Sequence, residues 1–209
     1  MKHSNLWKLI AVCWYGLLLT TICVLFWYKE RAYPVPTPIP SGYTNVNPGE
    51  IVNLPAYYRS TKNKPVFLHF FNPDCSCSRF NIAHFRSLVN RYGSQINFSV
   101  VVISNKIYTV ENIQEKFGID IPVRFDTGLA RICGVYSTPQ AVIIKPDNSL
   151  YYRGNYNKNT YSTNRKTNYA ELALSNLLYG RSIQSPYQFS VRAHGCPLPS
   201  CAGKLYVKR

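Results

Sequence analysis

Acidic residues are scarce in this sequence of 209 residues. Asp and Glu number 9 against 24 Lys and Arg, which gives a net charge of +15. So few carboxylates argue against a site built for acid–base catalysis by paired acids. The basic residues form no block of five or six and match no nucleic-acid-binding motif, so we expect no nucleic-acid partner. Their excess fits a surface that lies near anionic lipid headgroups.

The chain also lacks low-complexity tracts, and 46% of its residues are hydrophobic, which predicts one globular domain with appendages. Residues 9–28 carry no charge. A helix of that length crosses the roughly 30 Å hydrocarbon core of a bilayer. Trp7 and Trp27 flank the run, where interfacial aromatic residues lie, and no small-x-small cleavage pattern follows it. We predict an uncleaved, single-pass transmembrane anchor over residues 1–30.

The charges that flank this run barely decide its orientation. Lys2 and Lys8 on one side nearly balance Lys29 and Arg31 on the other. Five of the seven cysteines lie outside the run, which suits an oxidising compartment or redox catalysis. We therefore predict a cell-membrane protein whose soluble domain lies on the outer, periplasmic face.

Proline occupies every second position near the start of the soluble part, between residues 33 and 40. This spacing enforces an extended polyproline-like backbone and excludes helix. We predict a stiff linker over residues 31–52, a domain over residues 53–181, and a cysteine-containing tail over residues 182–209.

Strand and helix patterns alternate along the domain. Strands are predicted over Val66–Phe71, Ile96–Ile103, Ala141–Ile144 and Leu150–Arg153, and helices over Arg79–Tyr92, Glu111–Phe117, Thr127–Cys133 and Thr167–Leu178. The order β-α-β-α-α-β-β-α predicts a three-layer α/β/α sandwich. Its central sheet is mixed, with the last two strands as an antiparallel hairpin.

Two cysteines, Cys75 and Cys77, stand where the first predicted strand runs into the first predicted helix. A thiol at the first turn of a helix faces unpaired backbone N–H groups and the positive end of the helix dipole, which favours the thiolate. Cys75 is therefore the best-placed nucleophile in the chain.

A second motif, Gly-Val-Tyr-Ser-Thr-Pro-Gln-Ala-Val over residues 134–142, follows further along. Together with the strand that leads into Cys75, it makes residues 53–181 resemble thioredoxin-like redox proteins. The resemblance is to the redoxin branch that includes alkyl hydroperoxide reductase and thiol-specific antioxidant relatives. It implies that Pro139, preceded by Thr138, is a cis-proline opposite the active cysteine, where it presents main-chain polar groups to a thiol substrate.

The chain departs from the usual Cys-x-x-Cys pattern of that family, because Ser78 takes the second cysteine's position. Cys77 is the nearest other thiol, but a Cys-x-Cys disulfide closes a very small ring. Cys133 is a second possible partner for Cys75, although it falls on an apolar helical turn where buried cysteines are common.

Cys196 and Cys201 in the tail are further possible partners. They lie five residues apart and are bracketed by prolines. A structural Cys196–Cys201 disulfide and a resolving role toward Cys75 both remain open.

Thiol–disulfide exchange is the function that these cysteines favour, with protein or small-molecule thiols and disulfides as partners and no cofactor. Thiol peroxidase activity is an alternative in the same branch. The peroxidase pattern, however, has Thr or Ser three residues before the reactive cysteine and Pro four before that, where this chain has Asn72 and Leu68.

Copper handling is the alternative from another class, because soft thiolates suit Cu(I) and related folds serve as membrane-anchored copper chaperones. Those relatives use cysteines three apart and a histidine after a later strand. None of His69, His84 and His194 stands at that position. A zinc site is also disfavoured, because no second thiol pair has finger-like spacing. We therefore assign no metal ligands from the sequence.

Overall fold

The structure, a computed structural model, describes residues 2–32, 36–59, 62–158, 167–181 and 192–199. The chain divides into two compact units, residues 1–35 and 36–209. The first unit is one helix, α1 (Lys2–Ala32), in which Asn5–Tyr28 is long and apolar enough to cross a membrane. Its described side chains are exposed throughout.

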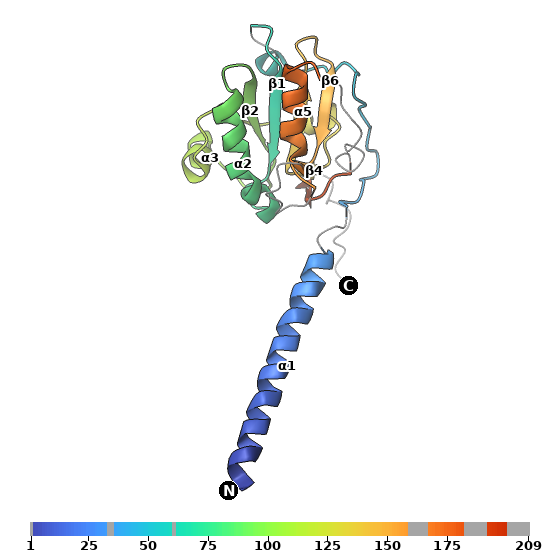
Figure 1. The fold of residues 1–209 in the computed structure, drawn as a ribbon. Helices are drawn as coiled ribbons and strands as arrows, with labels where there is room; N and C mark the ends of the chain where they lie inside the picture. Colours follow the sequence, from blue (N-terminus) through green and yellow to red (C-terminus); the bar gives the residue numbers. More distant parts are fainter. Residues whose placement is uncertain (1, 33–35, 60–61, 159–166, 182–191, 200–209) are drawn as a thin grey trace. The chain divides into compact units, whose positions relative to one another are not determined.

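A five-stranded mixed sheet forms the centre of the second unit, in the order β3-β2-β1-β5-β6 (Figure 1). Its strands are β1 (Val66–Phe71), β2 (Asn97–Val102), β3 (Val123–Phe125), β5 (Gln140–Ile144) and β6 (Leu150–Gly154). The first three are parallel, whereas β5 is antiparallel to β1 and β6 is antiparallel to β5. The parallel strands need helical crossovers, while β5 and β6 need only a short turn.

Helices cover both faces of this sheet. On one face, Phe67 and Phe71 of β1 share a buried cluster with residues of α2 (Ser76–Tyr92), α3 (Val110–Phe117) and α5 (Tyr169–Leu178). On the other, Leu68 and Phe70 cluster with residues of α4 (Thr127–Ile132) and of the short helix η1 (Ala56–Tyr58). Alternate side chains of a strand point to opposite faces, so all six residues of β1 are buried. The predicted three-layer, thioredoxin-like fold is confirmed.

The eight predicted elements all occur, with boundaries within two residues except that α2 begins three residues earlier than predicted, at Ser76. Three short strands do not appear in the prediction: β3 at the sheet edge, β4 (Ser137–Thr138) and β7 (Cys196–Pro197). β4 and β7 pair antiparallel in a second, two-stranded sheet. Strands of two or three residues are too short to show a period, which is why pattern analysis misses them.

Residues 36–54, here called the strap, pack against the domain although most of them were predicted to be linker. The strap pairs with the turn before β6, where Gly49 N–H donates to the Leu150 carbonyl oxygen at 2.7 Å and Val52 N–H donates to the Asn148 carbonyl oxygen at 2.8 Å. Val52 and Leu54 are buried in the second core cluster. These contacts make the strap part of the folded unit, while the four predicted boundaries stay predictions.

Candidate active site

Cys75 lies at the N-cap of α2, immediately after β1 and a tight Asn-Pro-Asp turn. The turn is closed by Cys75 N–H, which donates to the Asn72 carbonyl oxygen at 3.1 Å. The Cys75 carbonyl oxygen in turn accepts from Arg79 N–H at 3.1 Å, the first hydrogen bond of the helix. The Cys75 side chain makes no capping hydrogen bond, and the residue stands at the positive end of the α2 dipole.

A disulfide joins Cys75 to Cys196, 121 residues further along the chain. The pairing of β4 with β7 brings the two cysteines together, because Thr138 lies opposite Cys196 in this ladder. Cys75 Sγ is 3.8 Å from the Thr138 carbonyl oxygen. The Thr138–Pro139 peptide bond is cis. The sequence left the partner of Cys75 open among three regions, and the structure selects the tail.

Cys77 supplies a third sulfur at the same point. It lies in the first turn of α2, is half-buried and is a free cysteine. The Sγ atoms of Cys75, Cys77 and Cys196 all lie within 4.8 Å of one another. Cys75 is only 4% exposed, so Cys77 and Cys196, both of intermediate burial, form the outer side of this group of three sulfurs.

Two residues outside the predicted site, Thr37 and Ser137, hold the backbone around Cys196 in place. The strap residue Thr37 donates its N–H to the Ala193 carbonyl oxygen at 2.7 Å and its hydroxyl to the Gly195 carbonyl oxygen at 3.0 Å. The Thr37 hydroxyl also contacts Ser137 Oγ at 2.9 Å, and Ser137 Oγ donates to the Cys196 carbonyl oxygen at 3.2 Å. The sequence gives little sign of these contacts between the strap, β4 and the tail. Its one hint is the glycine before Cys196, and a single residue is weak evidence.

Only glycine fits at position 195, because the backbone there packs directly against β4. A Cβ atom at this position would collide with the Thr138 carbonyl oxygen, which is backbone and cannot move aside as a flexible side chain would. The close approach of the tail to β4 therefore depends on the absence of a side chain one residue before Cys196.

Asp74 precedes Cys75, but its charge is compensated by other groups. Its carboxylate accepts from Lys106 Nζ at 2.7 Å, Ser104 Oγ at 2.8 Å and Tyr108 Oη at 2.9 Å. The hydrogen bond from Lys106 contributes most to holding the pKa of Asp74 below its usual value. These bonds reduce the repulsion that a neighbouring carboxylate would exert on a Cys75 thiolate, and they tie the 104–108 loop to the start of α2.

Cys133 is not part of the group of three sulfurs. Cys133 is fully buried at the C-terminal end of α4, and burial raises its pKa to about 12. A thiol with such a pKa stays protonated and is a poor nucleophile at neutral pH. Cys201 lies outside the described residues, as do residues 182–191 and 200–209 of the predicted tail.

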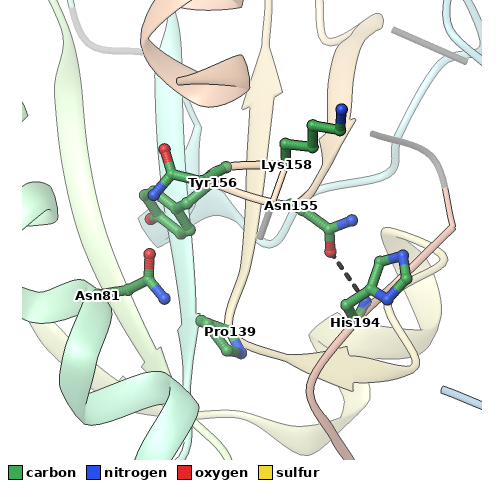
Figure 2. Close-up of a pocket in the computed structure, with 7 residues that line it drawn as sticks. Asn81, Pro139, Asn155, Tyr156, Lys158 and His194 are labelled. Atoms are coloured by element: carbon green, nitrogen blue, oxygen red, sulfur yellow. Dashed lines mark hydrogen bonds between the residues drawn. The ribbon is translucent and has the colours of Figure 1, made fainter. Parts of the chain in front are cut away.

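A small pocket is lined in part by Pro139, the residue after Thr138 (Figure 2). Its lining combines side chains from α2, the Pro139 turn, the segment after β6, and the tail: Asn81, Pro139, Asn155, Tyr156, Asn157, Lys158 and His194. His194 N–H donates to Asn155 Oδ1 at 3.0 Å, which fixes the tail two residues before Cys196. With a volume of about 20 Å³ the pocket has room for one water molecule.

His69 is buried in the middle of β1 beneath this region. Its Nδ1 lies 2.7 Å from Tyr156 Oη, and its ring stacks on Phe85 with centroids 4.3 Å apart. Burial, helped by the nearby His84, lowers the pKa of His69 to about 3. His69 is therefore a neutral core histidine, and neither it nor His84 nor His194 shares the group of three sulfurs.

The sheet order, the flanking helices and redox cysteines at the N-terminus of α2 define a thioredoxin-like protein. The chain belongs to the family described as a domain of unknown function, DUF6436, whose model matches residues 46–197. No curated protein matches the chain in sequence.

Solved structures support the fold. A hypothetical protein from Sinorhizobium meliloti 1021 is similar with a TM-score of 0.60 and 16% identity, over 74% of this chain and 95% of that one. An uncharacterized conserved protein from Geobacillus kaustophilus gives 0.56 and 17%, over 77% and 91%. A weaker likeness, to a secreted disulfide oxidoreductase from Mycobacterium tuberculosis with a TM-score of 0.42 and 13% identity over 60% of this chain and 85% of that one, adds nothing to this support. At these identities the likeness concerns the fold alone.

Proposed function

We propose that this protein is a membrane-tethered thiol–disulfide oxidoreductase that cycles between the Cys75–Cys196 disulfide and the two thiols. The observation that carries the proposal is the disulfide itself, which links a cysteine at a helix N-terminus to one on β7, beside Thr138 and Pro139. Its substrates are protein or small-molecule disulfides and thiols. The two sequence motifs support the narrower assignment to the redoxin branch, which is part of this proposal.

In the reducing direction, the Cys75 thiolate attacks a substrate disulfide, and the first substrate thiolate leaves as a mixed disulfide forms. The Cys196 thiolate then attacks Cys75 Sγ, and the second substrate thiolate leaves. The substrate has gained two electrons, the protein holds the Cys75–Cys196 disulfide, and each released thiolate takes up a proton. Thr138 and Pro139 border the attacking sulfur and offer main-chain groups to the substrate.

Regeneration by a dithiol donor returns two electrons to the protein, but the donor attacks the other sulfur, forms a mixed disulfide with Cys196, and is released as its own disulfide by its second thiolate. Because Cys75 is 4% exposed and Cys196 is half-buried, the donor meets Cys196 Sγ first. Attack there expels the Cys75 thiolate, which the N-terminus of α2 stabilises. Exposure thus assigns Cys196 as the entry sulfur and Cys75 as the leaving group.

The test is insulin reduction with dithiothreitol, catalysed by the full chain in detergent micelles. Cys75→Ser is expected to abolish catalysis, and Cys196→Ser is expected to accumulate a mixed disulfide with a substrate because the resolving thiol is missing. Cys133→Ser, which changes a buried thiol of raised pKa, serves as the matched control. Retention of full activity by Cys75→Ser would overturn the proposal.

A further inference from the structure

The exchange reaction needs two cysteines, yet three sulfurs meet at the site. Cys77 Sγ lies within 4.8 Å of both Cys75 Sγ and Cys196 Sγ. We infer that the reduced protein binds one Cu(I) ion through Cys75, Cys77 and Cys196. This metal site goes beyond the proposed exchange activity and does not depend on it.

The fold brings the three donors together from two elements. Cys75 and Cys77 stand at the N-cap and in the first turn of α2, and Cys196 stands on β7. The tail is fixed before Cys196 by Thr37 and Asn155, and at Cys196 by the β4 ladder. Reduction therefore separates two sulfurs whose backbones stay anchored, so the three thiolates remain around one point.

The distances suit a single ion. Metal–sulfur bonds of about 2.3 Å in a trigonal arrangement place the sulfurs about 4 Å apart. The three Sγ atoms already lie within 4.8 Å of one another, so rotations of the side chains suffice to reach this geometry. The amide groups at the N-terminus of α2 offset part of the negative charge that three thiolates bring.

The donor set selects the kind of ion. Three thiolates are soft ligands, which suit Cu(I) and Zn²⁺ rather than Mg²⁺, Ca²⁺ or Mn²⁺. Protein-held structural zinc almost always has four ligands. In the part of the chain that the structure describes, no histidine, aspartate or glutamate joins the three sulfurs, and the neighbouring Asp74 carboxylate is engaged by Lys106, Ser104 and Tyr108. Cu(I), which accepts three-coordination, is the ion that this set fits.

The disulfide makes the site dependent on redox state. In the oxidised protein two of the three sulfurs are bonded to each other, so only Cys77 is left as a thiol ligand. A dithiol donor reduces the bond by two electrons and frees Cys75 and Cys196. Cu(I) then binds as the three thiols release their protons. By linkage, bound Cu(I) protects the dithiol form against reoxidation.

The sequence alone does not reveal the third sulfur ligand of this site. The sequence showed two thiols at Cys75 and Cys77 and no histidine at the expected position, which argued against a metal site. The third donor comes from Cys196, and the sequence gives no sign that it lies beside the other two, because 119 residues separate it from Cys77.

The experiment is a Cu(I) titration of the reduced full chain in detergent micelles, under anaerobic conditions and in competition with a chromophoric Cu(I) chelator. We expect one copper ion per chain, three sulfur neighbours by X-ray absorption, and no tight binding by the oxidised protein. Cys77→Ser is expected to lower the affinity at least about tenfold, since one of three ligands is lost, and to leave two sulfur neighbours. Cys133→Ser is the matched control and should bind as the unmodified protein does.

Three outcomes would overturn the inference: no copper retained by the reduced protein, two sulfur neighbours in the unmodified protein, or equal affinity after Cys77→Ser. Insulin reduction is measured on the same preparations. Catalysis without copper binding would contradict the copper site and support the proposed exchange activity. Copper binding without catalysis would support the copper site and contradict the exchange activity.

Discussion

Gly195 shows how much of the site depends on one missing side chain. Because a Cβ there would strike the Thr138 carbonyl oxygen, Gly195→Ala must push the tail away from β4. We expect a loss of about 1–3 kcal/mol in the free energy of unfolding and slower closure of the Cys75–Cys196 disulfide. Urea unfolding and timed thiol trapping measure the two effects.

Gly128→Ala is the control for this substitution. The nearest atom to a Cβ at that position is Asp126 Oδ1 at 3.4 Å, an ordinary contact, and the residue lies in α4, where alanine is a better helix former. Equal stability of the two variants would contradict the assigned role of Gly195.

His69 makes stability depend on pH. Its pKa is about 3 in the folded protein and about 6.5 when unfolded, so between these values the unfolded chain binds the extra proton. Stability is fully present above pH 6.5 and is lost as pH falls, by about 2 kcal/mol at pH 5. Urea unfolding from pH 7.5 to 5 checks this.

A variant separates His69 from the other titrating groups. His69→Gln should show a clearly smaller loss between pH 7.5 and 5, because its side chain does not titrate. His84, whose pKa burial also lowers, acts in the same direction, and His84→Asn should keep most of the pH dependence. An unchanged slope in His69→Gln would contradict this assignment.

The strap is the element that links the start of the folded unit to the cysteine tail. Thr37→Val keeps the shape of the side chain but removes the hydroxyl that binds Gly195 and Ser137. We expect a loss of about 1–3 kcal/mol in stability, since buried partners lose a hydrogen bond. We also expect faster reduction of the disulfide by dithiothreitol, because the tail is held less firmly. Thr44→Val, an exposed site on the same strap, should change neither quantity.

The long elements were predictable because their hydrophobic patterns are strong. β1 and β2 are nearly continuous apolar runs, and α2 keeps a helical spacing over 17 residues. The position of Cys75 at the N-terminus of α2 was predictable for the same reason, since the residue stands where the pattern of β1 ends and that of α2 begins. The strap and β7 were missed because their order comes from contacts distant in sequence, such as Thr37 with Gly195, that no local pattern encodes.

At the scale of the whole molecule, α1 and the domain are separate units. The apolar side chains of Asn5–Tyr28 are exposed throughout, as a membrane-spanning helix requires. We propose that this helix anchors the protein with its domain on the periplasmic face, an arrangement that the disulfide supports because such bonds persist in oxidising compartments. A reporter fused after Arg209 that works only in the cytoplasm would overturn this orientation.

Truncation tests where the soluble unit begins. A chain that starts at Pro36 is expected to be soluble without detergent and to keep exchange activity. A chain that starts at Asn53, the predicted domain boundary, loses Thr37 and the buried Val52, together with the strap's hydrogen bonds to Asn148 and Leu150. We expect it to unfold at a lower urea concentration or to aggregate, as measured by circular dichroism and size-exclusion chromatography. Equal stability of both chains would place the boundary where the sequence suggested.

The separation of 121 positions between Cys75 and Cys196 also bears on how the protein is made. The ribosome completes Cys75 and Cys77 long before Cys196, so a nascent chain that enters an oxidising compartment has at first only the wrong thiols available. Early oxidation would join Cys75 to Cys77 or Cys133, and a thiol isomerase would then have to move the bond to the tail. We therefore expect co-expression with a disulfide isomerase to raise the fraction of protein that carries the native Cys75–Cys196 bond.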